Sequence, residues 1–165
     1  MKNTQKVMIN IKSAHFTPSD GYVKNVSLVD PFAAELFDSV DAQRIDVDYS
    51  GTLAVSRGRL VIRYDESELT GMPGATTEVS FALDNPNIVM MQRTGTVNTS
   101  FCFEKGERIE CVQDTGDMTL SFVVDTDALS NELTQCGGDL KISYGMEVRG
   151  SLVQRSLMHL AVSLV

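Results

Sequence analysis

Apolar and polar residues alternate along most of this chain, and no other feature constrains its fold as strongly. Val7, Ile9 and Ile11 show the pattern near the start, where they alternate mostly with polar residues. Successive side chains of a β-strand point to opposite faces, so such a segment predicts a strand with one buried face and one face in water. The same alternation marks residues 44–49, 59–65, 78–83, 118–124, 140–148 and 158–164.

Short turn signals separate these segments. Gly, Pro, Asn and Asp gather between them at spacings of about 8–12 residues, which is typical of antiparallel hairpins in a sandwich or a barrel. A parallel pair of strands needs a crossover of about a dozen residues or more. The sequence therefore predicts an all-β antiparallel meander, and with no repeat or linker in sight we expect residues 1–165 to form a single domain.

Two segments depart from the alternation. Residues 30–40 carry apolar residues at helical spacing, Asp30 can cap the first N–H groups, and Pro31 suits the first helical position. We expect a short amphipathic helix there that either plugs one end of a barrel, which we favour because its apolar face needs burial, or acts as a lid. Residues 126–136 also fit a helix. Their apolar residues at helical spacing are Leu129, Leu133 and Cys136.

The hairpin around Gly106 admits two registers. A two-residue turn would place Cys102 opposite Cys111. A three-residue loop over residues 105–107 would instead place Phe101 opposite Cys111. The second register sets apolar residues against each other on one face, so we favour it.

Composition limits the partners and the compartment. The chain has 165 residues, 42% of them hydrophobic, and a net charge of −8, so it can bury a core but repels phosphate backbones and anionic membranes. Its start lacks the continuous apolar run of a signal peptide. The three cysteines, Cys102, Cys111 and Cys136, are odd in number and widely spaced. We therefore expect a cytoplasmic protein with reduced thiols, bound to neither nucleic acid nor membrane.

From residue 59 onwards, and in its first strand, the sequence resembles the YwiB-like family, small bacterial proteins of unknown function. The matching motifs lie in the expected order and are Tyr64-Asp-Glu66, Gly71, Gly74-Ala-Thr-Thr77, Arg93-Thr-Gly95, Phe101-Cys-Phe103, Thr115-Gly116, Thr126 and Leu140-Lys-Ile-Ser-Tyr144. The resemblance implies a lipocalin-like (calycin) barrel, here of about 8–10 strands. The segment from Phe16 to Gln43 is longer than the family leads us to expect, and residues 111–116 keep only the glycine of a family turn.

The usual parts of a catalytic or metal site are missing from the sequence. His15 and His159 are the two histidines, and no Cys-x-x-Cys pair accompanies them, so we expect no metal and no cofactor. Cys102 has the opposite strand parity to its two phenylalanine neighbours, and nothing nearby lowers its pKa. Residues 71–74 join two strands without a following helix, so they predict a turn rather than a phosphate loop.

The strongest candidate for a binding site is a carboxylate and a cation. Glu66 continues the inward face of Tyr64, and Arg93 ends a later strand from which it can reach Glu66. The favoured interpretation is an ordinary salt bridge at the barrel rim. The other is a pair that orients a polar group of a ligand, together with Tyr64 and Tyr144.

Three functions follow, in decreasing order. The first is non-catalytic binding of a small apolar or lipid-like molecule, since a barrel of this size can hold one small ligand. The second is a scaffold that acts through its surface as a homodimer. The third is an enzyme that uses Glu66 and Arg93. Fold alone favours none of them.

Overall fold

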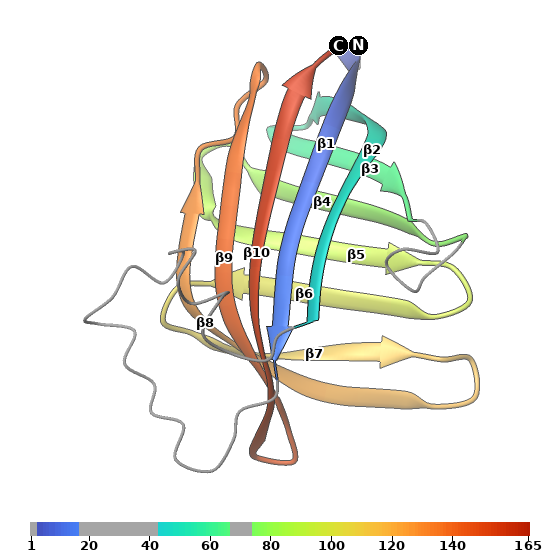
Figure 1. Cartoon of the computed structure of the whole chain (residues 1–165), viewed down its shortest axis with the longest axis vertical. Coiled ribbons are helices and arrows are strands. Elements are labelled where there is room, and N and C mark those ends of the chain that lie inside the picture. The colour runs from blue at the N-terminus through green and yellow to red at the C-terminus, as the bar shows by residue number, and fades with distance from the viewer. Residues whose placement is uncertain (1–2, 17–42, 67–73) are drawn as a thin grey trace.

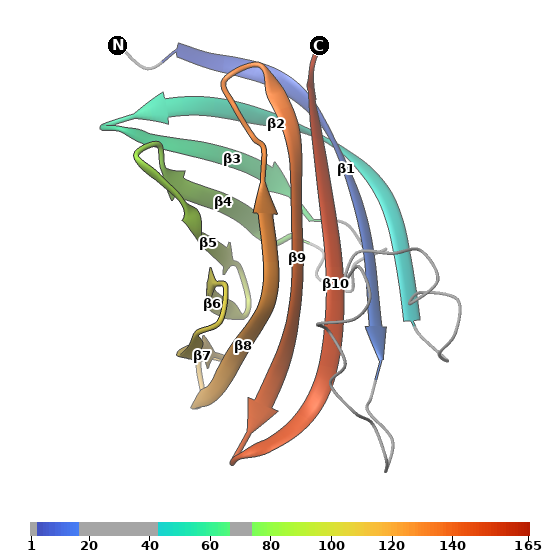
Figure 2. The ribbon, with the colours of Figure 1, turned by 90° about the vertical axis from the view of Figure 1, so that its left-hand side faces the viewer.

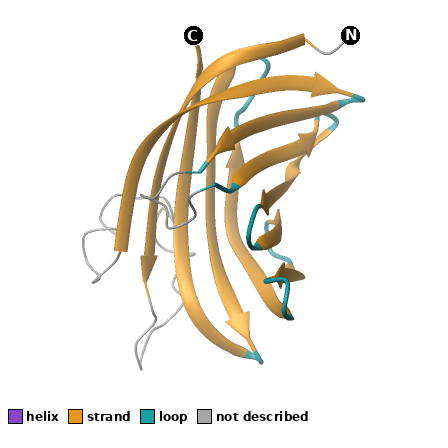
Figure 3. Cartoon of the chain, turned by 90° about the vertical axis from the view of Figure 1, so that its right-hand side faces the viewer, coloured by secondary structure: helices purple, strands orange, loops and turns teal. Residues whose placement is uncertain are grey.

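The alternating segments form ten strands. The structure is a computed structural model that describes residues 3–16, 43–66 and 74–165, and this part of the chain contains no helix (Figure 3). The strands are β1 (Asn3–Phe16), β2 (Gln43–Ser56), β3 (Arg59–Asp65), β4 (Thr76–Ala82), β5 (Asn85–Thr94), β6 (Asn98–Glu104), β7 (Arg108–Asp114), β8 (Thr119–Asn131), β9 (Gly137–Val148) and β10 (Ser151–Leu164).

The strands close into a barrel. Each one is antiparallel to the next along the chain, and β1 pairs with β10 to complete the ring (Figure 1). Ile9, for example, lies opposite Tyr49 on one side and Val162 on the other. The long strands β1, β2, β8, β9 and β10 curve around one side, and the shorter β3–β7 form the other (Figure 2). The prediction of an all-β antiparallel barrel is therefore confirmed, with ten strands.

Of the two predicted helices, one lies outside the described residues and the other is wrong. Residues 30–40 belong to the part of the chain that the structure leaves undescribed. In the second segment, β8 continues to Asn131 and a turn follows. Leu129 and Leu133 are four positions apart, and that spacing places two residues on the same face of a strand as well as of a helix. Both side chains pack with the barrel core, whereas Cys136 is exposed.

The register predicted for the hairpin around Gly106 is confirmed. Ser100 lies opposite Val112, an alignment that sets Phe101 opposite Cys111. Cys102 has the opposite parity and is half-buried on the outer face, so the two thiols lie on different faces of the sheet. All three cysteines are free thiols.

The two ends of the barrel differ in their connections. At one end the turns are short, as in the two-residue turn of Arg57 and Gly58, where both residues have positive φ. At the other end two connections are long: residues 17–42 join β1 to β2, and residues 66–75 join β3 to β4. Short turns follow β5, β7 and β9 at the same end. We call these the short-turn end and the long-connection end.

Apolar side chains fill the interior at the short-turn end. Leu60, Phe103 and Leu140 are 0% exposed there, so no space beside them admits even a water molecule. They are joined by other residues that are at most 1% exposed, namely Val7, Ile9, Leu53, Ile62, Val79, Phe81 and Val89. Polar side chains enter the interior at the long-connection end instead.

Candidate functional site

Polar side chains gather inside the barrel at the long-connection end. We call the following residues the polar cluster: His15, Tyr49, Tyr64, Glu66, Thr77, Arg93, Tyr144 and Ser156. Ladder pairing places them on neighbouring strands, because Thr77 lies opposite both Tyr64 and Arg93, and Ser156 lies opposite both His15 and Tyr144. Each has the inward parity of its strand. Tyr49 lies in the middle of β2, Glu66 directly follows β3, and the others lie toward the long-connection end of their strands.

Glu66 lies at the centre of the cluster's hydrogen bonding. Its side chain is only 1% exposed. The Thr77 hydroxyl donates to Oε1 at 2.6 Å, and the Tyr49 hydroxyl donates to Oε2 at 3.3 Å. The Glu66 backbone N–H donates to the Ala75 carbonyl at 2.8 Å and so ties the end of β3 to the start of β4. Local backbone pairing therefore fixes the carboxylate in the interior.

Arg93 brings the opposing charge. Its Nε lies 3.4 Å from Glu66 Oε1, and its guanidinium carbon lies 5.9 Å from the centre of the Phe101 ring. The 3.4 Å distance makes an ion pair, but the Nε–H is not aligned for a hydrogen bond and has no acceptor among the described residues. The two charges are thus paired, but the Arg93 Nε–H makes no hydrogen bond with the described residues.

Tyr64 stacks beside this pair. Its ring lies 5.0 Å from that of Tyr49, with 27° between the two planes. Burial raises the pKa of the Tyr64 hydroxyl well above its usual value, and the nearby Glu66 charge raises it further. The Arg93 charge and a hydrogen bond with Thr77 act in the opposite direction. The phenol therefore stays protonated and serves as a neutral donor.

A second chain of hydrogen bonds crosses the interior from β1 to β9. His15 Nδ1 lies 2.7 Å from Ser156 Oγ, and the Ser156 hydroxyl also forms a hydrogen bond with Tyr144. Burial lowers the pKa of His15, and the positive charge of Arg93 lowers it further. Burial raises the pKa of Tyr144. The Arg93 charge also opposes the rise in the pKa of Tyr144, so it acts on both ends of this series of hydrogen bonds.

Two hydroxyls complete the polar interior. Thr99 faces inward beside Arg93 on the neighbouring strand, and Thr126 lies opposite Tyr144. They are 3% and 1% exposed, and within the described part of the chain neither Oγ1 has a hydrogen-bond partner. Buried polar atoms are satisfied by protein, water or ligand in nearly all proteins. These atoms therefore indicate where a bound molecule can add contacts.

The sequence predicted four members of the cluster: Tyr64, Glu66, Arg93 and Tyr144. The structure brings all four into the same end of the interior, with Glu66 and Arg93 in an ion pair. It adds four members that sequence reasoning missed, which are His15, Tyr49, Thr77 and Ser156. A usable signal existed, since each continues the inward parity of an apolar strand into a polar residue.

A second buried ion pair lies outside the cluster. Arg155 pairs with Asp127, and its guanidinium donates to Ser143 Oγ at 3.2 Å. Arg155 and Gly145 are opposite each other, one position from Ser156 and Tyr144, so they have the outward parity. Asp127 is the extra residue of a β-bulge between Thr126 and Ala128. This pair contributes to the structure of the wall rather than to the interior site.

The described residues form neither a metal site nor a reactive thiol. No group of three or more His, Cys, Asp or Glu side chains in residues 3–16, 43–66 and 74–165 is placed to hold a metal ion. His159 contacts Asp139 at 2.8 Å on the outer face. Burial raises the pKa of Cys102 and of Cys111, which disfavours the reactive thiolate. Within the same ranges no helix is long and apolar enough to cross a membrane.

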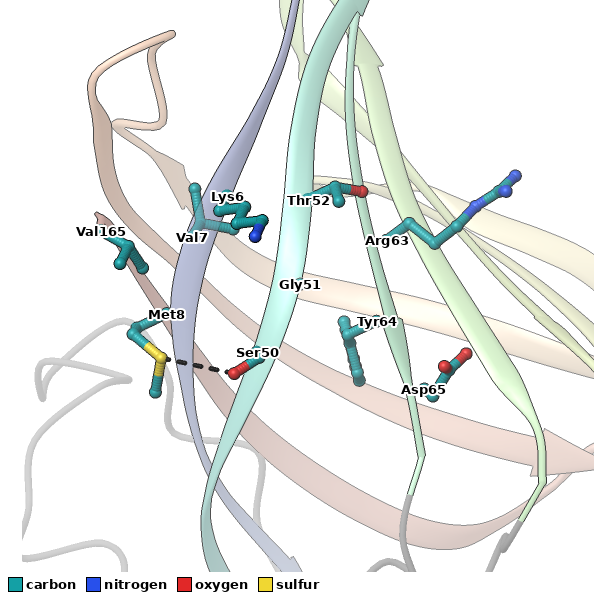
Figure 4. A pocket seen from close by; sticks show the side chains of 10 residues that line it. All are labelled: Lys6, Val7, Met8, Ser50, Gly51, Thr52, Arg63, Tyr64, Asp65 and Val165. Carbon is teal, nitrogen blue, oxygen red and sulfur yellow. Dashed lines mark hydrogen bonds between the residues drawn. The ribbon is translucent and has the colours of Figure 1, made fainter.

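A groove of about 490 Å³ lies on the outer face of β1, β2 and β3 (Figure 4). Its polar side chains include Lys6, Arg63 and Asp65, all of them exposed, and Ser50 Oγ donates there to Met8 Sδ at 3.7 Å. Such groups are already hydrated and gain little from a ligand. The buried polar cluster is therefore the stronger candidate site.

The fold and the site together define the class: a closed ten-stranded antiparallel barrel with an apolar interior at one end and a buried polar cluster at the other. Residues 35–160 match the model of a family described as a domain of unknown function, DUF1934. The chain belongs to the DUF1934 family, because this match covers most of its length.

One solved structure extends the comparison to the whole chain. The crystal structure of the ywiB protein from Bacillus subtilis matches with a TM-score of 0.71 and 15% sequence identity, over 98% of this chain and 93% of that one. None of the curated proteins compared with the chain matches it. The predicted relation to YwiB-like proteins is confirmed, and at this identity the structural likeness concerns the fold alone.

Proposed function

We propose that this barrel binds a small molecule at the polar cluster and that it acts as a binding protein without catalysis. The observation that carries the proposal is the set of buried polar atoms of the interior that make no hydrogen bond with the described residues: Arg93 Nε, Thr99 Oγ1 and Thr126 Oγ1. A barrel interior that needed only stability would gain more from apolar side chains at these positions. A ligand that supplies polar contacts offsets the cost of their burial.

The packing of the interior limits where the ligand lies. The short-turn end is filled by side chains that are at most 1% exposed, so a long apolar tail has no room there. The polar end offers hydroxyls, an imidazole and a guanidinium that converge from different strands. Convergent polar groups on a rigid wall are typical of small-molecule sites. The ligand we propose is therefore polar at its buried end, in line with the interpretation of the sequence in which Glu66 and Arg93 orient a polar group of a ligand.

Native mass spectrometry of the protein purified from its own host tests this proposal. We expect a mass above the 18.1 kDa of the chain that disappears when the protein is denatured. The released molecule, added back, should raise the melting temperature of the wild type. Glu66→Gln should abolish that rise, because it removes the ion pair that fixes Arg93. Arg63→Gln, which alters an exposed arginine of the outer face, is the matched control.

Two outcomes contradict the proposal. One is a preparation from the host that carries no bound small molecule. The other is a released molecule that stabilises Glu66→Gln as much as it stabilises the wild type, since the ion pair would then have a structural role only.

A further inference from the structure

We propose that the ligand bears a carboxylate and that Arg93 binds it. This inference rests on the proposed function and names the chemical class of the molecule that the polar cluster takes. It depends on the balance of donors and acceptors around Arg93, on the Phe101 ring beside its guanidinium, and on the close packing of the short-turn end.

The hydrogen-bonding deficit of the cluster is on the side of the donors. Glu66, the acceptor at its centre, receives hydrogen bonds from Thr77 and Tyr49. Arg93 carries five N–H donors, and its Nε–H is buried without an aligned acceptor in the described part of the chain. A ligand that adds acceptors corrects this deficit, whereas one that adds only donors leaves the Arg93 Nε–H without an acceptor. A carboxylate supplies two oxygens in a plane that matches the guanidinium fork.

Contacts with Phe101 and Glu66 hold the Arg93 guanidinium in place for a carboxylate. The guanidinium carbon lies over the Phe101 ring, and the Arg93 side chain keeps 25% of its surface exposed although its Nε atom is buried, whereas the Glu66 side chain is 1% exposed. The ion pair with Glu66 keeps the charge from being isolated in the interior. Because that contact is 3.4 Å long and unaligned, it leaves the directional bonds for a ligand.

The neighbours of Arg93 favour an anion with hydroxyl contacts. Thr99, on the adjacent strand, has a buried hydroxyl that can donate to a carboxylate oxygen. The tyrosine hydroxyls of the cluster are held protonated by burial, as the raised pKa values of Tyr64 and Tyr144 indicate, so they add no negative charge to repel an anion. The filled short-turn end restricts the rest of the ligand to the long-connection end. We therefore infer a compact carboxylate rather than a long-chain fatty acid.

The test compares probes of matched size and shape, in which a carboxylate is replaced by the neutral amide, whose NH2 donates hydrogen bonds. Benzoate and benzamide, and butyrate and butyramide, are titrated into the wild-type protein while the ¹⁵N resonance of the Arg93 Nε–H is followed by NMR. We expect at least one of the two carboxylates to shift this resonance and to bind about tenfold more tightly than its amide, the factor that one charge-assisted hydrogen bond supplies. Methyl phosphate is a third arm, and a tetrahedral oxyanion should bind more weakly than a planar one.

Variants separate the fork geometry from the charge. Arg93→Lys keeps the charge but loses the planar fork, so it should weaken binding of the carboxylate about tenfold. Thr99→Val should weaken it by a smaller factor with little change in fold. Arg63→Gln on the outer face should leave the affinity unchanged. The titration of the wild-type protein does not depend on any variant, so it still tests the inference if Arg93→Lys fails to fold.

The outcomes also separate this inference from the proposed function. Equal binding of carboxylate and amide, preference for methyl phosphate, or a carboxylate bound without a shift at Arg93 overturns the inference and leaves ligand binding in place. The inference is also overturned, and ligand binding kept, if neither carboxylate binds and the protein purified from its host carries a neutral molecule. A host preparation without any bound molecule removes the proposed function itself.

Discussion

Burial changes how the Glu66–Arg93 pair should be regarded. A rim salt bridge between exposed side chains contributes about 1 kcal/mol or less, because water solvates both partners whether or not they meet. Here the carboxylate is 1% exposed, and hydroxyls in addition to the arginine solvate it. The loss of one member would therefore leave the other charge in an environment that stabilises it poorly.

We predict that Glu66→Gln lowers the free energy of unfolding by about 2 kcal/mol, less than the loss for a fully buried pair because the Arg93 side chain is 25% exposed. Arg63→Gln is the matched control, since Arg63 pairs with Glu78 at 2.7 Å on the outer face with 62% and 32% of the side chains exposed. Its cost should be at most about 1 kcal/mol. Urea unfolding of the two variants measures both values, and equal costs would mean that the interior pair behaves like a surface pair.

His15 makes the stability depend on pH in a defined direction. Its pKa in the folded protein is below the ordinary 6.5, because of burial and of Arg93. As the pH falls below 6.5 the unfolded chain binds a proton at His15 before the folded protein does, so unfolding is favoured. Well above 6.5 the imidazole is neutral in both states and the effect is absent.

The measurement is the free energy of unfolding of wild type and His15→Asn between pH 8 and pH 5. The difference between the two should be constant above about pH 6.5 and should shrink below it, because the variant lacks the titrating group. Asn can keep a hydrogen bond to Ser156, so the comparison isolates the titration. Parallel curves across this range would contradict the prediction.

At the scale of the strand, Gly51 shows how one residue sets a close approach. It lies in β2 opposite Val7 and Tyr64. A Cβ placed there would lie 2.5 Å from the Arg63 carbonyl oxygen and 2.6 Å from Ile9 Cδ1. The first of these atoms belongs to the backbone of β3, which cannot move without disturbing the ladder.

Gly51→Ala should therefore destabilise the protein by about 1–3 kcal/mol through overpacking, although alanine favours folding at an ordinary strand position. Ser50→Ala, at the exposed neighbouring position, should stay within about 0.5 kcal/mol of the wild type. Thermal or urea unfolding compares the two. A Gly51→Ala variant as stable as Ser50→Ala would mean that β2 can shift away from β3.

The features of the strands that depend on neighbours in the chain could be predicted from the sequence, and those that depend on pairing between distant strands could not. Alternation and turn residues located the strands and the hairpin register around Gly106, because both depend on neighbours in the chain. The bulge at Asp127 could not be foreseen, since it depends on the pairing of β8 with β9. Glu66 and Arg93 were found because parity extends to strand ends. His15 and Ser156 were missed because they meet through the pairing of the first strand with the last.

At the scale of the whole molecule, closure is what assembles the site. β1 and β10 are the first and last strands, and their pairing brings His15 beside Ser156, 141 positions away in the sequence. The opposite wall supplies Glu66, which directly follows β3, and Arg93, which lies in β5. A polar cluster drawn from both walls forms only when the ring is complete, so the site and the global fold should be lost together on unfolding.

Ring closure has one more consequence, for assembly with other chains. A sheet that closes on itself has no free edge, so a partner cannot extend it by adding a strand, as happens in proteins that capture extended peptides. The predicted homodimer would therefore have to form through side chains of the outer face, such as the exposed Met90 and Val112. The native barrel is by the same reasoning a poor template for the strand-by-strand growth of fibrils.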